Sequence, residues 1–126
     1  MTAFVGILTA LAGGLGAACR MFVDAALNRR PRTIPIGTFG VNVTACLAMG
    51  LVSGVALAAP GDTVWLGVIG TGLLGGYSTF STAMVESARL LRAGRVRAGL
   101  AHGLGMLLVS LVALLAGQGT GLVLLC

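Results

Sequence analysis

The residues whose types and spacing are most informative about function lie between Gly72 and Glu86, inside an apolar stretch long enough to cross a bilayer. The pair Gly75-Gly76 is followed by hydroxyl side chains on both sides of Phe80. Glycine lowers helix propensity and hydroxyl groups compete for backbone hydrogen bonds, so we expect the helix to break here. Within lipid, the backbone groups freed by a break need protein or a water-filled path. The pattern therefore predicts a site where something polar binds or passes.

Other patterns that carry chemistry are missing from the sequence. It shows no nucleophile–base–acid set and no phosphate-binding loop, so an enzyme is not favoured. The acidic residues lie near a segment edge, in a loop or beyond the expected break: Asp24, Asp62 and Glu86. A proton-coupled transporter or a rotary ring subunit places its acidic residue inside a span, so neither class is favoured.

The composition is that of a membrane protein. The 126 residues are 57% hydrophobic and 9% charged, and the mean hydropathy is +1.05, whereas a soluble domain of this size needs a charged surface. Four apolar segments of spanning length are expected at Ala3–Leu27, Pro35–Ala58, Thr63–Leu90 and Gly99–Leu124. We therefore predict an all-α membrane protein with one domain over residues 1–126, no cleaved signal peptide and a break in the third helix.

Several side chains in these segments have more than one interpretation. Arg20 and Asp24 share a helix face and can pair, in a structural or a conducting role. Asn42 is costly in lipid unless paired, so it either joins helices or lines a polar path. His102 is expected to be a boundary residue rather than a proton relay. The cysteines follow no metal-binding spacing and are interpreted as free thiols: Cys19, Cys46 and Cys126.

Three stretches resemble the Fluc/CrcB family of small fluoride channels: Gly13–Arg20, Gly37–Asn42 and Gly75–Thr82. The resemblance implies a passive fluoride channel that lowers cytoplasmic fluoride by export across the cell membrane. It also implies an antiparallel dimer with two pores. A structural sodium ion is implied at the dimer centre, held by backbone carbonyls at the positions that match Gly75 and Ser78.

The same resemblance implies an anion path. Asn42 matches an asparagine whose amide can donate to fluoride, and Phe80 matches a pore phenylalanine whose ring edge is electropositive. The other matching positions are Ser81, Thr82 and Ser110. The chain departs from the family pattern at Ala83, where a second phenylalanine is expected, and at Met106, where a tyrosine is expected.

Two other functions remain as alternatives. A small multidrug-type transporter also has four spans, but it needs a glutamate inside the first span, which this sequence lacks. A non-conducting partner subunit of a membrane complex is the second alternative, because Ala83 and Met106 leave part of the usual pore lining missing.

The arginines divide the molecule into two unequal sides. The formal net charge is +5, and every arginine beyond Arg20 lies in or beside one of two connections: Arg29, Arg30 and Arg32, then Arg89, Arg92, Arg95 and Arg97. This bias predicts that both basic loops are cytoplasmic and that no nucleic acid is bound. An antiparallel homodimer needs nearly balanced loops. We therefore predict a heterodimer with a homologous subunit of opposite orientation, the alternative being a homodimer that tolerates the bias.

Overall fold

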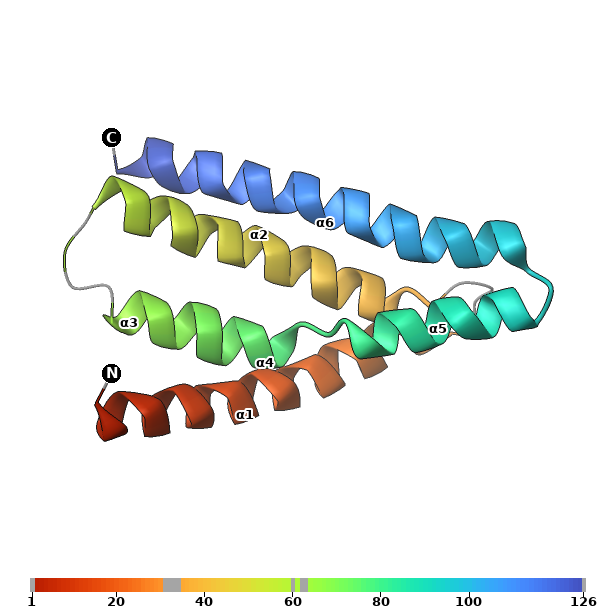
Figure 1. Cartoon of the computed structure of the whole chain (residues 1–126), viewed down its shortest axis with the longest axis horizontal. Coiled ribbons are helices and arrows are strands. Elements are labelled where there is room, and N and C mark those ends of the chain that lie inside the picture. Colours follow the sequence, from red (N-terminus) through yellow and green to blue (C-terminus); the bar gives the residue numbers. More distant parts are fainter. Residues whose placement is uncertain (1, 31–34, 60, 62–63, 126) are drawn as a thin grey trace.

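The computed structural model describes residues 2–30, 35–59, 61 and 64–125, and within them every regular element is helical (Figure 1). In this described part of the chain, three helices are long and apolar enough to cross a membrane: α1 (Ala3–Leu27), α2 (Gly37–Ala58) and α6 (Val96–Leu124). They match the first, second and fourth predicted segments, although α2 begins after Pro35 and α6 begins before Gly99. Four residues used in the sequence analysis lie outside the described residues: Arg32, Asp62, Thr63 and Cys126.

The third segment is divided, as predicted, into several helical pieces. They are α3 (Val64–Gly67), the π-helix η1 (Val68–Leu74), α4 (Gly75–Tyr77) and α5 (Ser81–Arg92). The chain leaves the helix at Ser78, whose φ of −76° and ψ of 162° are extended, and it becomes helical again at Ser81. The break therefore falls on Ser78–Phe80.

The glycine pair does not form this break. Gly75 is helical, with φ −63° and ψ −40°, and Gly76 continues the same helix. A Cβ on Gly76 would collide with the backbone of Gly13 in α1, and one on Gly16 would collide with Leu73. These glycines let α1 approach the third segment closely, which is the usual role of small residues at membrane helix contacts.

Helices α2 and α6 lie side by side over most of their length (Figure 1). Their contact is built from glycines on both helices: a Cβ on Gly50 would meet the carbonyl of Leu114, and one on Gly117 would meet that of Leu47. The most extensive helix contact among the described residues thus depends on the absence of side chains at matched positions.

The helix ends gather at two ends of the molecule. The end of α1, the beginning of α2 and the α5–α6 turn lie toward one end, and the beginning of α1, the end of α2 and the end of α6 lie at the other (Figure 1). The α5–α6 turn needs a glycine, because Gly94 has a φ of +77°. Arg95 N–H donates to the Leu90 carbonyl at 3.0 Å, and this bond closes the end of α5.

Large apolar side chains cover much of the outside. Phe22 is 77% exposed, Phe4 is 67% exposed and Leu107 is 64% exposed. A water-soluble surface does not present apolar side chains at this density, whereas a lipid-facing one does.

Candidate functional site at the helix break

Asn42 on α2 holds the broken backbone of the third segment. Its Oδ1 accepts from the Thr79 N–H at 2.8 Å, and its Nδ2 donates to the Thr79 carbonyl at 2.7 Å. In a continuous helix, Thr79 would bond to backbone groups four residues away. The Asn42 amide replaces both of those bonds, so this side chain compensates directly for the break.

Two further side chains satisfy the backbone near the break. Arg20 on α1 donates from Nη1 to the Ser78 carbonyl at 3.2 Å, and Thr79 Oγ1 accepts from the Thr82 N–H at 3.3 Å. The possible pair between Arg20 and Asp24 does not form among the described residues, and Asp24 Oδ1 accepts from Asn28 Nδ2 at 3.0 Å. Arg20 reaches across to the break and bonds to a backbone carbonyl there.

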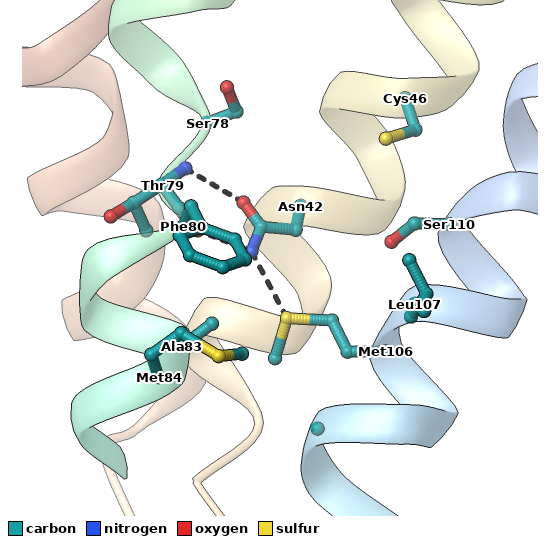
Figure 2. A pocket seen from close by; sticks show the side chains of 11 residues that line it. Asn42, Cys46, Ser78, Thr79, Phe80, Ala83, Met84, Met106, Leu107 and Ser110 are labelled. Carbon is teal, nitrogen blue, oxygen red and sulfur yellow. Dashed lines mark hydrogen bonds between the residues drawn. The ribbon is translucent and has the colours of Figure 1, made fainter. Parts of the chain in front are cut away.

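A cavity of about 240 Å³ opens beside Asn42. It is bounded by α2, the break, α5 and α6, and three of the predicted path residues line it: Asn42, Phe80 and Ser110 (Figure 2). The Ser110 Oγ is buried and has no hydrogen-bond partner within the described part of the chain. The cavity therefore combines an amide, an unsatisfied hydroxyl and an aromatic ring from three separate elements.

The other predicted path residues lie outside this cavity. Thr82 lines a second cavity of about 200 Å³, together with Arg20, Asp24 and Thr38. Ser81 is exposed and lines neither of these two cavities. Phe80 itself is 77% exposed, although it lines the cavity beside Asn42.

The two positions that depart from the family pattern are both buried. Ala83 is 2% exposed and Met106 is 4% exposed, and both line the cavity beside Asn42. Met106 Sδ accepts from Asn42 Nδ2 at 3.1 Å (Figure 2). The side chain that stands in place of the expected tyrosine therefore contacts the central amide directly.

The predicted carbonyl site at Gly75 and Ser78 can be compared with the hydrogen bonds around it. The Thr79 N–H would donate to the Gly75 carbonyl in a continuous helix, but it donates to Asn42. That carbonyl has lost its helical partner and belongs to an exposed residue. The Ser78 carbonyl accepts from Arg20 and keeps a second lone pair.

One buried polar network was not predicted. The Thr38 hydroxyl donates to Glu86 Oε1 at 2.9 Å, and His102 Nε2 lies 3.0 Å from Glu86 Oε2. His102 is only 1% exposed, so it is packed between helices, and a carboxylate partner for it was not expected from the sequence. Its partner is sixteen residues earlier, on α5, and only the packing of α5 against α6 brings the two together.

Comparison with known sequences identifies relatives over nearly the whole chain. The family profile described as CrcB-like protein, Camphor Resistance (CrcB) matches residues 7–118. A protein of Leifsonia xyli named fluoride-specific ion channel FluC 1 is 43% identical over 94% of this chain and 86% of its own length. Another of Bifidobacterium longum, named fluoride-specific ion channel FluC 3, is 44% identical over 75% of this chain and 79% of its own. The chain therefore belongs to the CrcB family of membrane proteins.

Proposed function

We propose that this chain is a subunit of a fluoride-specific channel that lowers cytoplasmic fluoride by passive export across the cell membrane. One observation carries the proposal: Asn42, Phe80 and Ser110, from different elements, line one cavity beside a helix break. The names of the relatives, fluoride-specific ion channel, support the same substrate. An enzyme is not supported, since the family relatives are named as ion channels.

The cavity suits a small anion that must also be released. Its polar groups are neutral, namely an amide, a hydroxyl and a ring edge, and Arg20 belongs to the neighbouring cavity. Several weak donors can replace part of the hydration of fluoride, whereas a full positive charge inside the cavity would hold the ion. Arg20, next to Thr82, is placed to attract the anion from the side.

An antiparallel dimer is supported by what a single subunit leaves uncovered. The break residue Phe80 and the freed carbonyl residue Gly75 are exposed. Freed backbone groups cannot face lipid, so a second protein surface must cover this part of the third segment. We infer that the breaks of two subunits meet at the dimer centre, which gives each cavity an aromatic wall from both chains.

A structural sodium ion fits this centre. The Gly75 carbonyl has lost its helical partner, and hard carbonyl oxygens are suitable ligands for such a cation. In a dimer, Gly75 and Ser78 of each subunit would hold the ion by their backbone oxygens. When bound, sodium would neutralise the crowded carbonyl dipoles and fix the two breaks against each other.

The partner is proposed to be a homologous subunit of opposite orientation. Arg29 and Arg30 follow the end of α1, and Arg92 and Arg95 flank the turn between α5 and α6. Such a bias favours one orientation, with the basic loops in the cytoplasm. A complementary subunit also restores aromatic lining that Ala83 does not supply.

Fluoride efflux from liposomes tests the function. The purified chain is reconstituted alone and together with a homologous subunit from the same source, and efflux is followed with a fluoride electrode. We expect fluoride but not chloride to leave, with much slower efflux when both Asn42 and Ser110 are replaced by alanine. The absence of fluoride-selective efflux in both preparations would refute the channel and favour a non-conducting subunit.

A further inference from the structure

We propose that the Met106 thioether occupies the anion's place at Asn42 when the pore is empty, and so determines how much fluoride is needed to fill it. The inference rests on the proposed function and adds a residue to it. A methionine carries no charge and no donor, so its effect on an anion must be indirect. The hydrogen bonds around Asn42 show how such an effect arises.

The Asn42 amide group donates one strong hydrogen bond and one weak one, and the weak bond can be exchanged. The first bond, to the Thr79 carbonyl, is 2.7 Å long and holds the helix break. The second, to Met106 Sδ, is 3.1 Å long and has a weak, neutral acceptor. An anion forms a stronger, charge-assisted hydrogen bond with the same N–H. Fluoride can therefore accept a hydrogen bond from the second N–H, while the first N–H keeps its bond to the Thr79 carbonyl.

A second donor faces the same space. Ser110 lies one helical turn after Met106 on α6, and its buried Oγ has no partner in the described structure. Asn42, Met106 and Ser110 line the same cavity of about 240 Å³ (Figure 2). An anion at this point would accept from both Nδ2 and Oγ, so the unsatisfied hydroxyl gains a partner only when the thioether gives way.

The Met106 side chain is able to move away from Asn42. Methionine is unbranched and has three rotatable side-chain bonds, so the sulfur can move within the cavity without a backbone change. Met106 is 4% exposed, which means that its N–H···S bond is shielded from water and is the alternative to an unsatisfied Asn42 proton. By satisfying that proton, the sulfur stabilises the empty pore and weakens fluoride binding.

The substitution Met106→Leu removes the acceptor and keeps the volume nearly constant. We expect the half-saturating fluoride concentration for efflux to fall by about threefold to tenfold, the range that corresponds to one hydrogen bond. Met49→Leu is the matched control, because Met49 on α2 faces Gly70 and lines neither cavity described above. The control should keep the wild-type value.

Thermal unfolding in detergent with added fluoride gives a readout that does not depend on conduction. Fluoride should raise the melting temperature of Met106→Leu more than that of wild type or Met49→Leu. An equal rise in all three proteins, or no rise in any, overturns the role of Met106. Absence of efflux with a normal fluoride-dependent shift would instead refute the channel function. If the leucine variant does not fold, Met106→Ile removes the same acceptor.

Discussion

At the scale of single residues, Asn42 combines two roles that the sequence presents as alternatives. It joins helices, because it bonds to both backbone groups of Thr79, and it lines the candidate path. The choice could not be made from sequence, since it depends on which backbone groups the break frees. Met106 could not be identified at all, because an isolated methionine in an apolar helix has no pattern that distinguishes it from core.

The first prediction concerns Asn42→Ala. If Asn42 only lined the path, its loss would impair fluoride passage and leave the folded protein intact. Because Asn42 also bonds to Thr79, we predict a stability loss of about 2 kcal/mol as well, since part-buried backbone groups lose their partners. Thermal unfolding in detergent and fluoride efflux measure the two effects. Thr120→Ala is the control, since Thr120 bonds only within its own helix, to Ala116. An unchanged melting temperature for Asn42→Ala would contradict a stabilising role for the hydrogen bonds between Asn42 and Thr79.

The second prediction uses the thiols. Cys46 lines the cavity beside Asn42, whereas Cys19 is exposed on α1 and lies outside it. Methylthiolation should slow fluoride efflux by reducing the space in the cavity, at least severalfold in this wild-type background. The Cys46→Ser variant should resist the reagent and Cys19→Ser should remain sensitive. If both variants stay sensitive, ions do not pass the cavity near Cys46.

At the scale of elements, the third segment shows what sequence can and cannot place. The break was predictable because hydroxyl residues and glycines gather there, but it falls on Ser78–Phe80 and not on the glycine pair. The glycine pair instead lies at the contact with α1, which packs so closely that Gly76 has no room for a Cβ. The pair between Glu86 and His102 could not be predicted from the sequence either, because it depends on the register between α5 and α6.

The third prediction separates the two glycines. A Cβ on Gly76 would collide with the Gly13 backbone, whereas on Gly75 the nearest outside atom is the Gly70 carbonyl, at an ordinary 3.8 Å. Gly76→Val should therefore lower the yield of folded subunit. Gly75→Val should leave the subunit folded but weaken the dimer, because Gly75 is exposed in a single chain.

Size-exclusion chromatography and thermal unfolding in detergent distinguish the two outcomes. Gly14→Val is a suitable control, since nothing lies within 4 Å of a Cβ at Gly14. Equal dimer content in Gly75→Val and wild type would remove Gly75 from the proposed dimer centre and with it the sodium site.

At the scale of the whole molecule, hydropathy places the long helices well because lipid imposes a minimum length on them. The helix bounds of α1 were predicted at both ends, Ala3 and Leu27. The partner surface could not be derived in the same way, since lipid-facing and subunit-facing apolar side chains have the same composition. The exposed break is the feature that separates them, and only the folded chain reveals which residues it exposes.

The last prediction concerns orientation and partnership. Arg29 and Arg30 follow the end of α1, and Arg92 and Arg95 flank the α5–α6 turn. The end of α1 and this turn lie toward one end of the molecule, and the beginning of α1 and the end of α6 lie at the other (Figure 1). Arginine is retained on the cytoplasmic side during insertion, so we expect one orientation with the C-terminus outside. A chain that inserts in only one way cannot form an antiparallel homodimer. Reporter fusions after Leu125, with this chain expressed alone, should therefore give an external signal only, and fluoride efflux should require a homologous subunit of opposite orientation.

Removing positive charge tests whether the arginines cause this orientation. The triple variant Arg29→Ser, Arg30→Ser and Arg92→Ser should insert in both orientations, whereas Arg20→Ser, away from both connections, should keep one. Comparable signals from both sides for the unmodified chain, together with efflux by that chain alone, would establish the homodimer instead.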